Sequence, residues 1–263
     1  MPRRNTGKRS IARRFELGRV LGIPIEVDAS WLLVLALVTW TLSRHHFPAE
    51  LPQLPSAAHW LIGLTAALLL FTCVLLHELG HCVVARMAGI PVSRVTLFIF
   101  GGVAHIAHDP RRPLVELRIA LAGPLVSAGI ALLARTLAAA IPLGGTSSLI
   151  GAALLRYLAA VNLVILLFNL LPGFPLDGGR ALRSILWASL RDLRLATRIV
   201  TLLGSVLGFG LLALGVLVFL RGNGIGGLWY ICLGAFLHDA ARASYQEVRL
   251  RMLWAKGRPS SRR

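Results

Sequence analysis

The sequence predicts an all-α polytopic membrane protein, with six transmembrane helices and a membrane-associated β-hairpin between the second and the third. Hydrophobic residues make up 56% of the chain, mean hydropathy is +0.72, and charged residues are only 15%. These values are far more apolar than those of soluble domains. The apolar residues gather in runs that approach the ~20 residues needed to cross a bilayer as a helix. Basic residues fill the segments between the runs, which is typical of membrane topology.

The apolar runs give the expected spans in chain order. They cover residues 29–42, 60–85, 114–141, 149–168, 199–220 and 226–237. The first run is short of the ~20 residues that a full crossing needs, unless the segment just before it also enters the membrane interface. The last run is also short, so we expect its helix to extend beyond these limits.

The basic residues indicate the orientation of the spans. Seven Lys or Arg precede residue 29, five lie in 86–118, five in 180–198 and seven after residue 241. Together they are 24 of the 28 basic residues, and six crossings place all of them on one side of the membrane. Because cytoplasmic loops are enriched in Lys and Arg, both termini are expected to be cytoplasmic. The formal charge of +17 therefore reflects topology and does not indicate a nucleic-acid partner.

The segment 92–106, between the second and third spans, is rich in β-branched and aromatic residues around the pair Gly101-Gly102. This composition predicts a hairpin that dips into the membrane. Irregular backbone at that depth is stable only where protein or a wet cavity covers it. An open strand edge there could pair with an extended peptide. A plain amphipathic connector is the alternative interpretation.

A cluster of ionisable residues lies inside the second apolar run. His77 and His81 are four positions apart, so on a helix their imidazoles share one face and can bind a single ion. Glu78, beside them, can reach an adjacent water, as in the zinc-peptidase pattern. Ionisable groups are costly in hydrocarbon and are found there mainly where they have a function. The sequence therefore predicts a metal site within the membrane, in its cytoplasmic half.

A third metal ligand has to come from elsewhere in the chain, because catalytic zinc normally takes three protein ligands. The metzincin continuation H-E-x-x-H-x-x-G-x-x-H is absent. Most later carboxylates lie in loops, at span ends or in the tail: Asp109, Glu116, Asp192, Asp239 and Glu247. Asp177 remains, directly after the fourth apolar run. Pro172 and Pro175 break the helix there, while Gly178 and Gly179 let the backbone approach closely. A loop that only ends the helix is the alternative.

These segments resemble the site-2 protease family of intramembrane zinc metalloproteases. The stretch from His77 to His81 matches the zinc helix of that family. The stretch from Asn169 to Gly178 matches its second signature, Asn-x-x-Pro leading to Asp-Gly. The Gly-Gly pair of the hairpin and the tripeptide Ala-Gly-Pro at 122–124 also fit. The resemblance is to the compact bacterial type related to the sporulation-factor processing protease.

The resemblance implies a role for each matching residue. His77, His81 and Asp177 would bind one zinc ion, and Glu78 would be the catalytic base. Asn169 would bind substrate or support the active site, and Gly101 and Gly102 of the hairpin would act similarly. Residues 29–242 would form a six-span metalloprotease domain between a basic cytoplasmic arm with an interfacial segment at 1–28 and a basic cytoplasmic tail at 243–263. A PDZ domain or a cystathionine-β-synthase-type pair, found in other relatives, is not expected here.

The function implied is zinc-dependent intramembrane endopeptidase activity in the cell membrane. The partner would be a membrane-anchored protein, with a transcriptional regulator as one candidate, cleaved within a transmembrane or membrane-embedded segment. A membrane metal-ion transporter or channel that uses the same His and Asp groups is the alternative. A catalytically silent protein that sequesters membrane helices is a second one. Neither alternative needs a base at Glu78.

Overall fold

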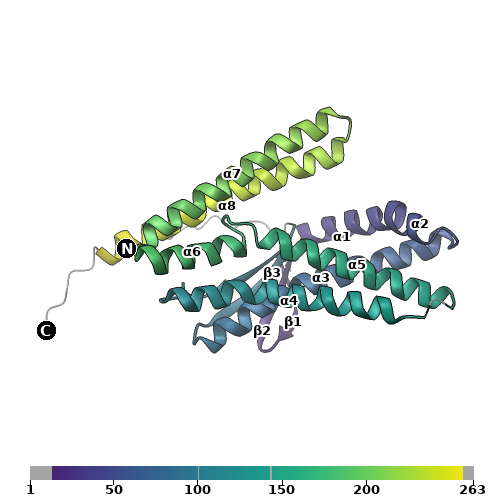
Figure 1. Cartoon of the computed structure of the whole chain (residues 1–263), viewed down its shortest axis with the longest axis horizontal. Helices are drawn as coiled ribbons and strands as arrows, with labels where there is room; N and C mark the ends of the chain where they lie inside the picture. The colour runs from purple at the N-terminus through teal and green to yellow at the C-terminus, as the bar shows by residue number, and fades with distance from the viewer. Residues whose placement is uncertain (1–13, 100, 143, 257–263) are drawn as a thin grey trace, which may run out of the picture.

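The computed structural model describes residues 14–99, 101–142 and 144–256, so parts of the basic arm and of the tail lie outside the described residues. Long helices make up most of the molecule, and one small sheet lies beside them (Figure 1). The elements in chain order are β1 (Arg14–Val20), β2 (Ile23–Asp28), α1 (Ser30–Thr41), the π-helical turn η1 (Leu42–His46), α2 (Phe47–Glu50), α3 (Ser56–Met87), β3 (Val92–Phe98), β4 (Gly101–Ile106), α4 (Pro113–Ala140), α5 (Thr146–Asn169), α6 (Asp177–Leu190), α7 (Leu193–Leu220) and α8 (Gly224–Lys256).

Among the described residues, four helices are long and apolar enough to cross a membrane: α3, α4, α5 and α7. They coincide with the second to fifth predicted spans, and the chain is a membrane protein. The first predicted span corresponds to α1, which is only 12 residues long before the π-helical turn interrupts it. The last lies in α8, where the apolar part continues without a break into a polar segment that includes His238 and Asp239. Neither helix meets the length and hydropathy of a full span, so six crossings remain a prediction.

The strands form one sheet in the order β1-β2-β3-β4. The hairpin predicted over 92–106 is present as β3 and β4, which pair antiparallel between α3 and α4. β1 and β2 form a second antiparallel hairpin, and β2 pairs parallel with β3. This second hairpin was not predicted. Its turn is made by Leu21 and Gly22, both with positive φ, where a sequence-based prediction looks for Asn-Gly or Asp-Gly.

The sheet packs against the C-terminal half of α3 and the first part of α4. Alternate residues of β2 are buried, and they join a core cluster with α3, β3 and α4 that includes Ile23, Ile25, Leu79, Cys82, Ala85, Val95 and Ile119. Leu79 and Cys82 therefore face the sheet. The opposite side of the same helical turns carries His77 and His81 and faces α6.

Local signals explain the helix ends near the site. α3 ends at Met87, and Gly89 with φ of 75° lets the chain turn back so that Ile90 donates to the carbonyl of Ala85. α4 starts with Pro113 at its first position, where a missing N–H costs nothing. Asp192 caps α7 by accepting from the backbone N–H groups at its start. α7 and α8 then run side by side as a long helical hairpin that leans away from the other helices (Figure 1).

Candidate metal centre

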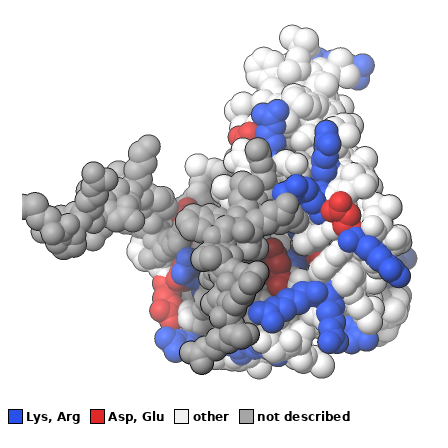
Figure 2. All heavy atoms as spheres, turned by 90° about the vertical axis from the view of Figure 1, so that its left-hand side faces the viewer, with Lys and Arg blue, Asp and Glu red and all other residues white. Residues whose placement is uncertain are grey.

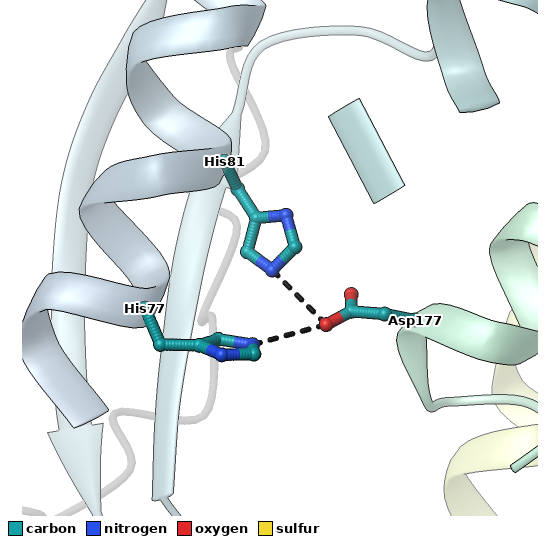
Figure 3. A group of neighbouring side chains, drawn as sticks. All are labelled: His77, His81 and Asp177. Carbon is teal, nitrogen blue, oxygen red and sulfur yellow. Dashed lines mark hydrogen bonds and ion pairs between the residues drawn. The ribbon is translucent and has the colours of Figure 1, made fainter. Parts of the chain in front are cut away.

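Three donor side chains from distant parts of the chain meet between α3 and α6. The Nε2 atoms of His77 and His81 each lie 3.0 Å from the same oxygen, Oδ2 of Asp177, which is the first residue of α6 (Figure 3). One donor atom from each residue lies within 4.8 Å of the others. All three residues are buried, with exposed fractions of 3%, 3% and 8%. The structure thus brings together the three residues singled out as ligands from the sequence.

The other ring nitrogen of each histidine is held by α4. Nδ1 of His77 lies 2.9 Å from Oγ of Ser127, and Nδ1 of His81 lies 2.6 Å from the carbonyl oxygen of Ile119. A carbonyl oxygen only accepts, so Nδ1 of His81 carries a hydrogen and the neutral ring offers the lone pair of Nε2. That lone pair faces a carboxylate, which also only accepts. A cation between these two acceptors satisfies both of them.

The charge of the third donor is favourable for metal binding. Asp177 is an acidic residue whose Oδ2 lies 3.0 Å from both imidazole nitrogens, so its carboxylate can bring a negative charge to a cation held between them. Two imidazole nitrogens and one carboxylate oxygen are a donor set typical of catalytic zinc, which keeps a fourth position for water. Gly123 of α4 leaves the necessary room, because a Cβ there would overlap Nε2 of both histidines. The residues present therefore fit a zinc ion.

Glu78 lies between the histidines and the β3–β4 hairpin. Its carboxylate accepts a hydrogen bond from the backbone of Ala104 in β4. Gly102 of the same strand is so close that a Cβ there would lie 2.5 Å from Cγ of Glu78. The hairpin thus covers the carboxylate, and a larger residue than glycine at position 102 would collide with Glu78.

A cavity of about 380 Å³ opens at these groups. Its walls combine the polar residues His77, Glu78, His81, Asn169, Asp177 and Arg180 with Gly101, Gly102 and apolar residues of α3, β3, β4, α5 and α8. The amide of Asn169 donates to the carbonyl of Ile165 in its own helix, at 3.0 Å. The three residues suggested only by resemblance, Asn169, Gly101 and Gly102, therefore line the same cavity as the donor set.

Several groups at this site were missed in the sequence. Ser127 and the carbonyl of Ile119 orient the histidines, and Arg180 lines the cavity. A backbone carbonyl has no sequence signal at all. Ser127 had a weak sequence signal, because it lies four residues after Gly123 and so on the same helical face. A single serine in an apolar helix is common, however, and does not by itself indicate a role at a metal site.

The fold and the donor set define a membrane protein with a buried His-His-Asp metal centre beside a carboxylate. The family described as peptidase family M50 matches residues 65–144 and 141–214. These segments include both histidines and Asp177 and cover more than half of the chain. The chain therefore belongs to peptidase family M50.

Individual relatives agree with this assignment. The chain is 40% identical over 240 residues to Rip3 of Mycobacterium tuberculosis, whose name describes a zinc metalloprotease, with 91% of this chain and 60% of Rip3 covered. It is 37% identical over 118 residues to Stage IV sporulation protein FB of Bacillus subtilis, with 44% of this chain and 38% of that protein covered. The chain thus spans about 60% of the length of Rip3.

A solved structure shares the fold. The Site-2 Protease from Methanocaldococcus jannaschii superposes with a TM-score of 0.60 at 29% identity, over 89% of this chain and 95% of that one. The resemblance to the site-2 protease family, inferred from the sequence, is confirmed.

Proposed function

We propose that the chain is a zinc-dependent intramembrane endopeptidase that cleaves a transmembrane or membrane-embedded segment of a protein. One observation carries the proposal: His77, His81 and Asp177 meet within bonding reach of one ion, with Glu78 beside them in the same cavity. Membership of a peptidase family whose named relatives include zinc metalloproteases supports it. The donor set by itself would also suit a metal transporter, but none of the relatives supports transport.

The proposed roles follow from the donor chemistry. His77, His81 and Asp177 would hold the zinc ion, which when bound would polarise the scissile carbonyl and acidify a water molecule. Glu78 would accept a proton from the attacking water and later deliver it to the leaving nitrogen. The hydrogen bond from Ala104 and the contact with Gly102 fix where Glu78 can make these transfers.

The β3–β4 hairpin is the proposed substrate platform. In the described part of the chain β4 is one of the two edge strands of the sheet, and four of its residues line the cavity: Gly101, Gly102, Val103 and Ala104. A helical substrate hides its carbonyls in hydrogen bonds, so it must unwind before attack. Pairing with a strand edge would hold the unwound segment extended. Asn169, on the facing wall, is proposed to contact that segment or support the site.

The proposed topology has six crossings in the cell membrane, with α1 and α8 as the first and last and both termini cytoplasmic. Figure 2 supports it, because Lys and Arg side chains gather on the end of the molecule that lies to the left in Figure 1. The proposed regions of the chain are a basic arm and interfacial segment at 1–28, the protease domain at 29–242 and a basic tail at 243–263.

The proposed substrate class is a membrane-anchored protein, with transcriptional regulators among the candidates.

The test is the replacement Glu78→Gln, which keeps the shape of the side chain and removes the base. Co-expression with tagged single-span proteins should yield a cleaved product with the wild type and none with the variant, while zinc content stays at one ion per chain. Removal of a general base typically lowers the rate by about 100- to 10,000-fold. Cleavage by the variant at the wild-type rate would refute the assigned base. Zinc flux through reconstituted vesicles without any cleavage would instead support the transporter.

A further inference from the structure

One face of α4 contacts both histidines of the metal centre. Glu116, Ile119, Gly123 and Ser127 are spaced by three or four residues, so they line the same side of the helix. All four are buried. Ile119 and Ser127 hold the ring nitrogens of the two histidines, and Gly123 leaves room beside both rings. The remaining residue of this face, Glu116, makes no contact with a histidine.

Glu116 instead connects α4 to the helix that carries Asp177. Its Oε1 accepts from Nε of Arg183 at 2.6 Å and from Nη2 of the same guanidinium. Both residues are buried, with exposed fractions of 1% and 6%. The guanidinium also lies 4.9 Å from the ring centroid of Phe174, in the loop before α6. Arg183, six residues after Asp177, therefore contacts both Glu116 of α4 and Phe174, which lies three residues before Asp177.

Stability alone does not account for such a pair. Burying two charges costs desolvation free energy, and apolar residues of similar size often replace a buried ion pair without loss of stability. A charge-assisted contact in which two N–H groups of one guanidinium share a carboxylate oxygen does something that apolar packing does not, since it fixes distance and direction. Here the contact fixes the orientation of α6 relative to α4, whose buried face orients the histidines.

We propose that Glu116 and Arg183 are a positioning pair that sets zinc affinity by holding Asp177 at coordinating distance from His77 and His81. The inference rests on the proposed zinc site and adds a residue pair to it. Neither residue touches the donor atoms, so the pair acts only through the placement of α6. Loss of such outer contacts typically weakens metal binding by about 10- to 100-fold.

The double variant Glu116→Leu with Arg183→Met tests this, because it leaves no unpaired buried charge. Zinc affinity is measured in detergent by competition with a chelator, and thermal unfolding is followed for the metal-free forms. We expect zinc affinity about 10- to 100-fold weaker and unfolding of the metal-free protein unchanged. Arg183→Lys, which keeps the charge but loses the fork, should weaken zinc binding in the same direction if the double variant does not fold. The matched control is Glu50→Leu with Arg156→Met, an ion pair remote from the donor set, which should leave zinc affinity unchanged.

A cycle with Asp177→Ala separates positioning from general support. In that background the pair replacement should cause no further loss of zinc affinity, because the ligand it positions is gone. An equal loss in both backgrounds, or wild-type affinity in both pair variants, would overturn the positioning role while the zinc site stands. If the wild type itself bound no zinc, the proposed function would fall and the inference with it.

Discussion

Two glycines at this site are needed because any side chain in their place would collide with a functional group. Gly123 lies next to the two histidine rings, and Gly102 lies next to the side chain of Glu78. Added methyl groups at the two positions should therefore produce different defects. Each glycine reports on a separate proposed role, zinc binding or proton transfer.

Gly123→Ala should remove zinc, since the new Cβ would overlap the two Nε2 atoms that face Asp177. Gly102→Ala should keep zinc and lower the cleavage rate, by at least about tenfold, because it displaces the base and not the ligands. Zinc content and product formation are measured on the same preparations. Gly129→Ala, in α4 with open space at its Cβ, is the control and should change neither. Equal zinc loss in the Gly102 and Gly123 variants would contradict the separation of roles.

At the scale of elements, the start of α6 is where backbone packing decides the site. Gly178 would overlap the carbonyl of Leu170 if it carried a Cβ, and Gly179 would overlap the carbonyl of Gly173. The loop between α5 and α6 is thus folded tightly back onto the first turn of α6. This packing places the carboxylate of Asp177 next to His77 and His81.

Gly179→Ala should force α6 away from the loop, with loss of zinc and a lower unfolding temperature in detergent. Gly210→Ala provides the comparison within a described helix, since a Cβ there meets open space. In a soluble helix such a change is favourable by up to about 1 kcal/mol, so no loss of stability is expected. Thermal unfolding with and without chelator measures both effects. A Gly179 variant with wild-type zinc binding would show that the close approach is not needed.

Local patterns predicted some elements well and others not at all. Helical spacing placed His77 and His81 on one face, and the Pro and Gly residues around Asp177 indicated a broken helix. The β1–β2 hairpin was missed because its turn uses Leu21 at positive φ, which no common turn preference suggests. The orienting face of α4 was missed because its contacts are long-range and include a backbone carbonyl. Glu116 was set aside as a ligand, and its partner Arg183 is 67 residues away, beyond any local signal.

At the scale of the whole molecule, the apolar helices and the distribution of basic residues determine the proposed orientation. Large apolar side chains on α7 such as Leu202, Val206 and Phe209 are exposed in the isolated chain, as expected for a surface that meets lipid. Basic residues cluster at the opposite pole from the η1–α2 segment in the proposed topology. The metal centre would then open towards the cytoplasm.

Labelling in intact cells tests this orientation. In a variant whose three native cysteines are replaced by Ala, His45→Cys should react with a membrane-impermeant maleimide added outside, because it lies in the predicted outer loop and is exposed. Arg242→Cys, exposed in the second half of α8, should react only after the membrane is opened. Reaction of both positions, or of Arg242→Cys alone, from outside would contradict cytoplasmic termini.

The most direct test of the account is X-ray absorption spectroscopy at the zinc edge of the purified protein. It should show zinc with two imidazole ligands at about 2.0–2.1 Å, completed by oxygen donors and without sulfur. Asp177→Ala should remove an oxygen donor from this shell or release the metal. A shell that contains sulfur, or one that is unchanged in the Asp177 variant, would contradict the centre formed by His77, His81 and Asp177.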